Sequence, residues 1–148
     1  MEAISLKINS SALIDSDYAA SGMKGESGMG WRGQRVAVIG LGVSNIPLIG
    51  YLVDEGARIT VCDRQQPADL EARLAQVAGL PVAYQLGEGY LDDLGDFDTV
   101  FLSPGIPKDL PEISALRERG VRLSSEMEVF FKLCQAPIAG ITGSSGKT

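Results

Sequence analysis

From Arg35 onward, short runs rich in β-branched residues alternate with stretches of helical periodicity. Runs that are apolar on both faces indicate a parallel sheet covered by helices on both sides and joined by right-handed crossovers. The expected strands are residues 35–39, 58–62, 82–86, 99–102, 121–123 and 138–141, and the expected helices are residues 44–55, 68–77, 111–119 and 126–133. The alternation predicts an α/β fold, a Rossmann-like parallel sheet with helices on both faces.

Several helix ends carry their own signals. Asp109 and Ser125 each stand three residues before a glutamate, which is the spacing of a capping box. Gly56 and Gly120 stand where a helix ends in a residue with left-handed backbone conformation. We therefore predict side-chain caps at Asp109 and Ser125, and glycine-terminated helices before Gly56 and Gly120.

Composition excludes several classes of function. The chain has 148 residues, enough for one domain with its own core, and 13 Lys plus Arg against 19 Asp plus Glu give a net charge of −6. This sign disfavours a nucleic-acid partner. Without any histidine, a Ser-His-Asp triad or a histidine-ligated zinc site is excluded. Cys62 and Cys134 each stand in an apolar run, which predicts buried thiols in a reducing, cytoplasmic setting.

The two ends of the chain differ from its middle. Residues 1–33 are rich in Ser and Gly, and we predict a disordered extension without a signal peptide. Residues 36–53 carry no charge, but the glycines and the proline within them indicate a strand, a turn and a helix rather than a membrane span. We therefore expect no membrane insertion.

The first motif, Gly40-Leu41-Gly42-Val43-Ser44-Asn45, follows the first strand and opens the first helix. Backbone N–H groups and the helix dipole at such a turn can bind a diphosphate. Asn45 stands where the dinucleotide-binding fingerprint has its third glycine, and Asp63 ends the second strand, where an acidic side chain binds a ribose or base. The alternative is that the glycines only form a tight turn and that Asp63 only caps a loop.

The second motif is Ser103-Pro104-Gly105-Ile106-Pro107, at the end of the fourth strand. Ligands of open α/β sheets bind beyond the carboxyl ends of strands, so this loop is expected beside the glycine turn. Its two prolines would make it stiff, and Gly105 would allow a ligand to approach closely. A rigid connection without ligand contact is the alternative.

The third motif lies at the end of the chain, where an expected strand runs into Thr142-Gly143-Ser144-Ser145-Gly146-Lys147-Thr148. Such a loop is typical of a nucleoside-triphosphate site, with lysine on the β- and γ-phosphates and threonine on magnesium. Ile141 stands where the strict pattern has its first glycine, and a Gly-Ser linker is the alternative.

Together, in this order and spacing, the three motifs resemble the Mur ligases of peptidoglycan synthesis. The resemblance covers residues 34–148 and is strongest to the members that add D-glutamate to UDP-N-acetylmuramoyl-L-alanine. That family has a shortened phosphate loop, here with Ser145 where Asn is usual. The resemblance implies an ATP-dependent ligase in which ATP phosphorylates the substrate carboxylate, with release of ADP, and the amine of D-glutamate then attacks the acyl phosphate, with release of phosphate.

The resemblance also implies roles for individual residues. Gly42, Val43 and Ser44 would contact the diphosphate of the UDP moiety, and Asp63 with Arg64 the uridine. The segment Ser103, Pro104 and Gly105 would face the phosphate or sugar side of the substrate. The ATP-binding residues would be Gly143, Ser144, Ser145, Gly146, Lys147 and Thr148, with Lys147 catalytic and Thr148 on Mg²⁺.

The resulting prediction divides the chain into three parts: a disordered extension (1–33), a Rossmann-like domain that binds the UDP substrate (34–136), and the first strand and phosphate loop of a truncated ATP-binding domain (137–148). We expect a monomeric fragment that is inactive alone and takes small-molecule substrates. Two other classes stay open: an NAD-binding module of an oxidoreductase or regulator, and a nucleotide-sensing protein without enzymatic activity.

Overall fold

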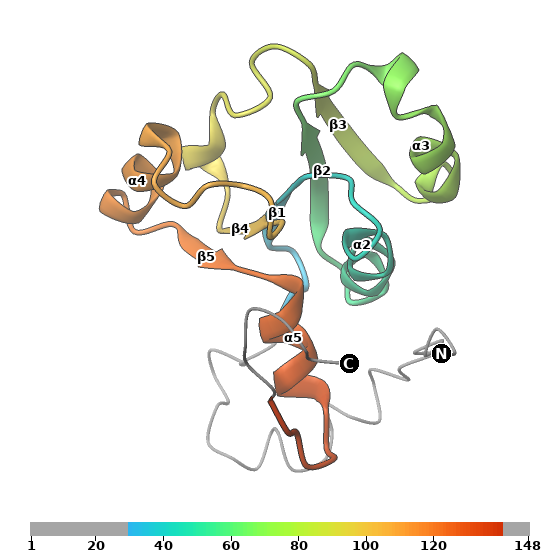
Figure 1. Ribbon diagram of the computed structural model, residues 1–148, viewed down its shortest axis with the longest axis vertical. Coiled ribbons are helices and arrows are strands. Elements are labelled where there is room, and N and C mark those ends of the chain that lie inside the picture. The colour runs from blue at the N-terminus through green and yellow to red at the C-terminus, as the bar shows by residue number, and fades with distance from the viewer. Residues whose placement is uncertain (1–29, 141–148) are drawn as a thin grey trace, which may run out of the picture.

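The computed structural model describes residues 30–140, which form one sheet with helices on both faces (Figure 1). The strands are β1 (Arg35–Ile39), β2 (Arg58–Asp63), β3 (Val82–Leu86), β4 (Thr99–Leu102) and β5 (Arg122–Ser124). The α-helices are α2 (Asn45–Asp54), α3 (Glu71–Val77), α4 (Pro111–Glu118) and α5 (Glu126–Leu133), and the short 3₁₀ helices are η2 (Pro67–Asp69) and η3 (Leu94–Asp96). The predicted α/β class is confirmed.

All strand pairs are parallel, and the order across the sheet is β3-β2-β1-β4-β5. The central strand β1 has Arg35 beside Arg58 of β2, and Val36 beside Thr99 of β4. The chain therefore builds outward from β1 on one side and then crosses to the other side. This reversal of direction at β1 places the carboxyl ends of β1, β2 and β4 side by side.

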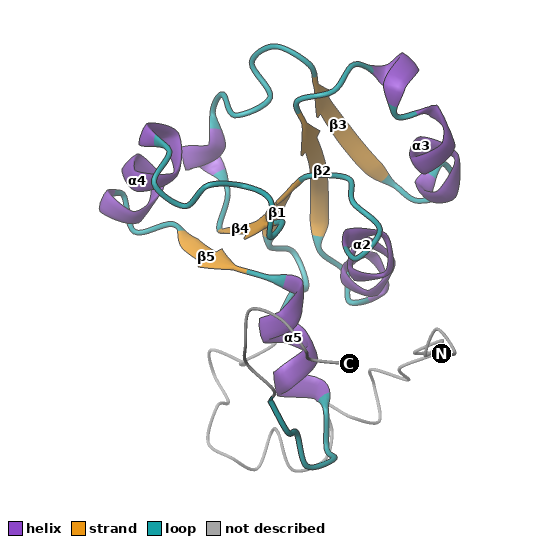
Figure 2. Ribbon diagram, viewed as in Figure 1, coloured by secondary structure: helices purple, strands orange, loops and turns teal. Residues whose placement is uncertain are grey.

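The core has two halves, one on each face of the sheet. Because successive strand residues point to opposite faces, Val36 and Val38 of β1 pack into one half, and Ala37 and Ile39 into the other. Helices α2, α3 and α5 contribute to the first half and α4 to the second, in agreement with the helices on both sides of the sheet in Figure 2.

The ends of α2 and α4 follow the same geometry. Each helix is followed by a glycine with positive φ, +89° at Gly56 and +79° at Gly120. The N–H of the residue after each glycine donates back across the last turn, from Ala57 to Leu52 O in the first case. This is the Schellman arrangement, which confirms both predicted glycine ends.

Of the two predicted capping boxes, only the one at Ser125 has a side-chain cap. Ser125 Oγ accepts a hydrogen bond from the N–H of Glu128, but the Glu128 carboxylate turns away and accepts from the Ser124 hydroxyl at 2.5 Å. The cap at Asp109 is wrong: α4 follows Leu110 and begins with Pro111, without a side-chain cap. Proline at the first helical position has no N–H to satisfy, and its fixed φ starts the helix by itself.

Residues 30–33 correct the predicted limit of the disordered extension. Trp31 is only 1% exposed, and its ring lies 5.5 Å from that of Phe101, with the Arg122 guanidinium 5.6 Å from its centroid. A large apolar ring that covers the core cannot belong to a solvated tail, because its burial stabilises the fold. Residues 1–29 lie outside the described residues, so disorder there stays a prediction.

The last expected strand, residues 138–141, is not formed in its described part. Residues 138–140 have no regular structure and are exposed, and residue 141 lies outside the described range. A strand needs the hydrogen bonds of a neighbour, and no described strand pairs with this segment. The predicted strand is therefore absent from residues 138–140 of this structure.

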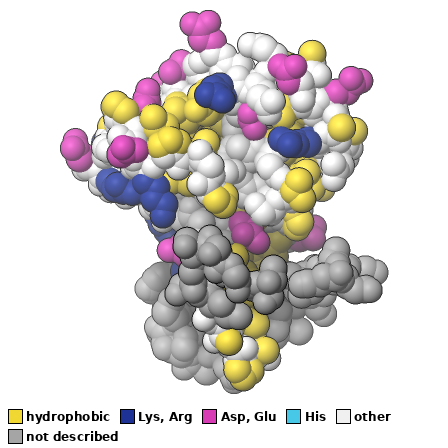
Figure 3. Space-filling model, viewed as in Figure 1, with side chains coloured by type: hydrophobic (Ala, Val, Ile, Leu, Met, Phe, Trp, Pro, Cys, Tyr) yellow, Lys and Arg dark blue, Asp and Glu magenta, His cyan; other side chains and the backbone are white. Residues whose placement is uncertain are grey.

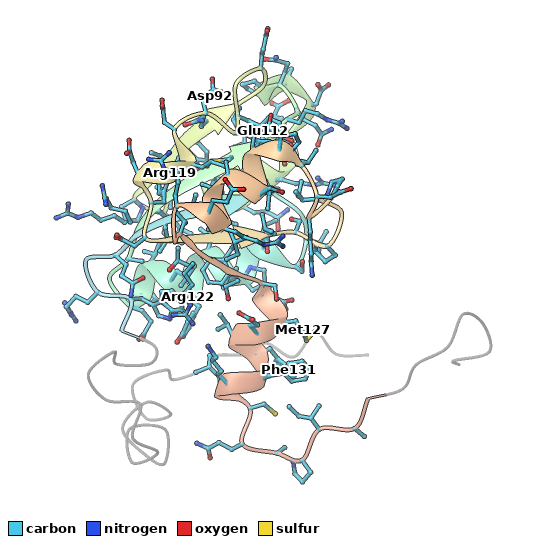
Figure 4. The ribbon with its side chains drawn as sticks, turned by 90° about the vertical axis from the view of Figure 1, so that its left-hand side faces the viewer. Asp92, Glu112, Arg119, Arg122, Met127 and Phe131 are labelled. Carbon is cyan, nitrogen blue, oxygen red and sulfur yellow. The ribbon has the colours of Figure 1, made fainter. Side chains whose placement is uncertain are left out.

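Helix α5 leaves part of its apolar surface uncovered. Met127 and Phe131 are about half exposed, at 48% and 50%, and Figure 4 shows them one turn apart on α5.

Among residues 30–140, no helix is long and apolar enough to cross a membrane.

Candidate functional site

Three segments of the first two predicted motifs meet at one edge of the sheet: the glycine turn, Asp63 and the loop after β4. Ile39, the last residue of β1, is in register with Cys62 of β2 and Leu102 of β4. The glycine turn that follows Ile39 therefore lies between Asp63 on one side and Ser103 on the other. This edge, at a reversal of strand order, is where open α/β sheets bind ligands.

Gly40 is a glycine because no side chain fits there. Its φ is +94°, and a Cβ on this residue would collide with the Ser103 hydroxyl. Its N–H donates to Cys62 O at 2.7 Å, which ties the turn to β2. Gly40 is therefore required by the contact between the turn and the loop after β4.

Gly42 differs from Gly40. It is not among the residues with positive φ, and a Cβ on it would meet no atom within 4 Å. Nothing in the described chain requires glycine here, so the space above the turn is open. Open space at this position suits the close approach of a ligand to the backbone.

Asp63 is buried, at 8% exposed, and both of its carboxylate oxygens bind the backbone. Oδ2 accepts from the N–H of Leu41 at 2.7 Å, and Oδ1 accepts from the N–H of Gln65 at 2.9 Å. Asp63 therefore holds the glycine turn against β2. Neighbouring Arg64 is exposed at the same edge.

Arg73 of α3 was not singled out by the sequence. Its Nη1 donates to Leu41 O at 3.4 Å, so the N–H of Leu41 binds Asp63 while its carbonyl faces a guanidinium. The spacing of charges along α3 carried no signal for this contact, because the contact depends on how α3 packs beside the turn.

Asn45 is the second residue whose role the sequence did not predict, although its departure from glycine was visible. It is 1% exposed, and its Nδ2 donates to Gly40 O at 2.7 Å and to Ser103 Oγ at 2.8 Å. The Ser103 hydroxyl in turn donates to Ile39 O at 2.9 Å. The hydroxyl that we expected to face substrate is thus bonded within the chain, while Pro104 and Gly105 are exposed.

The beginning of α2 presents unpaired backbone donors. Among residues 30–140, the N–H groups of Gly42, Val43 and Ser44 have no backbone or side-chain acceptor, and the Val43 side chain is 78% exposed. Asn45 N donates to Gly42 O, which closes a turn just before the helix. Free N–H groups together with the positive end of the helix dipole are features that favour the binding of an anion at this point.

A groove of about 480 Å³ adjoins this point, between α2 and α5. Its wall includes Leu48 and Val129, with Ser44, Asp54 and Glu126 among the polar residues, and none of the lining residues within 30–140 is Lys or Arg. Its carboxylates would repel a diphosphate. Anions are therefore expected at the free N–H groups rather than in the groove.

The other predicted groups are the ATP-binding residues, the magnesium ligand and the cysteines. The six residues Gly143–Thr148 lie outside the described residues, and within residues 30–140 no cluster of three His, Cys, Asp or Glu could hold a metal ion. Burial, with a smaller contribution from Asp63, raises the pKa of the Cys62 thiol to about 12, so Cys62 is an inert core residue as predicted. Cys134 is only partly buried, so the prediction of a buried thiol is wrong for that residue. On the face shown in Figure 3, basic side chains lie in separate groups among acidic ones.

Comparison with solved structures shows the fold. Shikimate dehydrogenase from Aquifex aeolicus superposes with a TM-score of 0.50 at 12% identity, over 84% of this chain and 57% of that one. The shikimate 5-dehydrogenase of Listeria monocytogenes gives the same TM-score, over 81% of this chain and 54% of that one. At this identity the likeness supports the Rossmann-like architecture alone.

Sequence relatives are much closer. A protein of Symbiobacterium thermophilum named UDP-N-acetylmuramoylalanine--D-glutamate ligase is 51% identical over 115 residues, and one of the same name from Acetivibrio thermocellus is 50% identical over 117 residues. These matches cover 78% and 79% of this chain, which spans about 25% of the length of each relative. The model of the Mur ligase MurD-like N-terminal domain matches residues 34–125, and the chain belongs to this family.

Proposed function

We propose that this chain is the substrate-anchoring N-terminal part of an ATP-dependent ligase that adds D-glutamate to UDP-N-acetylmuramoyl-L-alanine. The names of the relatives at about 50% identity support the reaction. The observation that carries the anchoring role is a set of three N–H groups at the start of α2, on residues Gly42, Val43 and Ser44, that have no acceptor in the described part of the chain.

In this proposal the diphosphate lies over the start of α2 and accepts hydrogen bonds from those N–H groups. Such bonds to a charged acceptor are stronger than neutral ones, because charge and dipole act together. The uridine lies toward the ends of β2 and β3, near Asp63 and Arg64. Since both Asp63 oxygens already accept backbone N–H groups, Asp63 acts mainly by shaping the turn, and the exposed Arg64 supplies the polar group for the uridine.

The sugar and peptide part of the substrate would pass the loop after β4. There the exposed Pro104 and Gly105 offer backbone for contact, since the Ser103 hydroxyl is engaged with Ile39 and Asn45. Gly105 has open space where its side chain would be, as Gly42 has. Two glycines with free space thus border the proposed path of the substrate.

The ATP and Mg²⁺ sites rest on sequence chemistry, since Gly143–Thr148 lie outside the described residues. The donor set fits: Lys147 would bind phosphate oxygens and Thr148 would bind Mg²⁺. ATP bound there would supply the phosphoryl group that activates the substrate carboxylate. We expect the 148-residue chain to anchor the UDP substrate without ligase turnover, and cytoplasmic location and a monomeric state remain part of the proposal.

The test measures whether the purified chain binds UDP-N-acetylmuramoyl-L-alanine, NADH or ATP. Binding is measured by calorimetry and by thermal melting. Ligand at a hundred times its Kd should raise the unfolding free energy by about 2.7 kcal/mol. The proposal predicts this effect for the UDP substrate and none for NADH. Stabilisation by NADH alone would instead favour an NAD-binding module.

A matched pair of variants tests the backbone contact. Val43 follows Gly42 in a turn position that accepts proline, so Val43→Pro removes one N–H while Val43→Ala keeps it. Loss of a hydrogen bond to a charged group, about 1.5–3 kcal/mol, should weaken substrate binding roughly tenfold or more. Equal affinities of the two variants would contradict the proposed diphosphate position.

A further inference from the structure

We propose that Asn45 is a positioning residue that holds the glycine turn and the loop after β4 at the separation that the diphosphate ligand requires. This inference rests on the proposed function and goes beyond it by assigning a role to a side chain that makes no ligand contact. It starts from the departure at the third position of the glycine motif, where Asn replaces Gly.

The geometry of the side chain supports this role. Asn45 is the first residue of α2, and side chains of a helix point toward its N-terminus. The amide therefore reaches back beneath the turn, where its two N–H bonds go to two different segments: Gly40 O at 2.7 Å and Ser103 Oγ at 2.8 Å. One buried amide thus links three segments, the turn, the helix start and the β4 loop.

The link also sets the direction of the peptide groups. The Gly40 carbonyl, bound by Asn45, and the Leu41 N–H, bound by Asp63, belong to one peptide group, which is thus held at both of its polar atoms. The carbonyl of the next peptide group, Leu41 O, accepts from Arg73. Within residues 30–140, the next three N–H groups, those of Gly42, Val43 and Ser44, have no acceptor. Donors that are oriented before binding lose less entropy when an anion arrives.

The same link explains why Ser103 is bonded within the chain. Its hydroxyl lies against Gly40, donates to Ile39 O and accepts from Asn45. A hydroxyl has one proton to donate, and that proton is already used. Ser103 therefore acts with Asn45 as a spacer, and ligand contacts on this loop fall to the backbone that follows.

The experiment measures UDP binding to the full 148-residue chain by calorimetry and by ¹H–¹⁵N NMR. The variants are Asn45→Ala, Ser103→Ala and the double variant, and the control is Gln34→Ala. Gln34 is a matched control because its amide also joins a backbone carbonyl to a hydroxyl, those of Gly30 and Thr99, at the opposite end of β1.

We expect Asn45→Ala and Ser103→Ala each to weaken UDP binding about tenfold, or about 1.4 kcal/mol. Because both remove the same link, the double variant should also lose about tenfold rather than a hundredfold. UDP should shift the amide signals of residues 42–44 in the wild type and in Gln34→Ala, and shift them much less in the two link variants. Spectra with wild-type dispersion establish that each variant is folded.

The other possible results contradict either the role of Asn45 or the proposed function. Wild-type affinity for UDP in a folded Asn45→Ala, with only the melting temperature lowered, would overturn the inference and leave the proposed function standing. Independent, additive losses would overturn the link between the two loops. If Asn45→Ala does not fold, Ser103→Ala decides alone, since it leaves the Asn45 side chain in place. Absence of UDP binding by the wild type would refute the proposed function itself, and the inference with it.

Discussion

Trp31 should contribute more to stability than the other described residues before β1, residues 30 and 32–34. It is 1% exposed, packs against Phe101 at 5.5 Å between ring centroids, and lies under the Arg122 guanidinium. Replacing a buried tryptophan by alanine costs about 3–5 kcal/mol, a large share of the roughly 5–15 kcal/mol that stabilises a domain. We therefore expect Trp31→Ala to be severely destabilised.

Two milder substitutions separate the contributions of individual contacts to this loss of stability. Among the described residues, Trp31 Nε1 has no hydrogen-bond partner, so Trp31→Phe gives up volume without losing a hydrogen bond. It should be clearly milder than Trp31→Ala. Arg122→Ala removes only the contact of the guanidinium with the ring, which is worth about 0.5–1 kcal/mol at an exposed site.

Urea unfolding followed by circular dichroism measures all three variants on one scale. With a slope of about 1.5 kcal/mol per molar urea, Trp31→Ala should lower the midpoint by roughly 2–3 M. A chain that begins at Gln34 should lose a similar amount, because it lacks the same ring. A loss below about 1 kcal/mol in Trp31→Ala would refute the inclusion of residues 30–33 in the folded unit.

Three further predictions concern single groups. Gly40→Ala should lose about 2 kcal/mol or more, because positive φ and a collision with a neighbouring hydroxyl act together, whereas Gly42→Ala should melt within a few degrees of the wild type and weaken UDP binding. A thiol reagent at pH 8 should modify Cys134 in the native chain and reach Cys62 only in urea, since burial raises the pKa of Cys62 to about 12. Hydrogen bonds from the first residue of β1 lower the pKa of Asp98, so its stabilisation is present above the ordinary pKa of 3.8 and is lost as pH falls through the lower, folded value. Asp98→Asn should remove that part of the acid sensitivity, under about 1 kcal/mol for an exposed pair, and an unchanged acid-unfolding curve would contradict it.

The local chemistry of the sequence determined most of the architecture. Strands β1, β3 and β4 and helix α5 begin and end at the predicted residues, because apolar runs and short-range caps specify them without reference to distant residues. Gly56 and Gly120 were predictable for the same reason, since a helix end needs a left-handed residue wherever the helix lies. The parallel sheet followed from the alternation of strands and helices.

Distant contacts decided the rest. The burial of Trp31 depends on Phe101, seventy residues further on, and the sequence around Trp31 resembles a flexible tail. Whether residues 138–140 form a strand depends on a neighbouring strand, and the described sheet offers none. Propensity alone cannot supply a hydrogen-bond partner.

The candidate site shows the same division within a few residues. The sequence indicated that Gly40, Asp63 and Ser103 lie close together, because each stands at the carboxyl end of a strand and these ends share one edge of the sheet. Only the tertiary structure showed that Asp63 and Ser103 bind the chain itself, with Asn45 between the loops. A polar side chain that could meet either a ligand or the backbone has the same sequence signature, and its partner is decided by which atoms folding brings within hydrogen-bond distance.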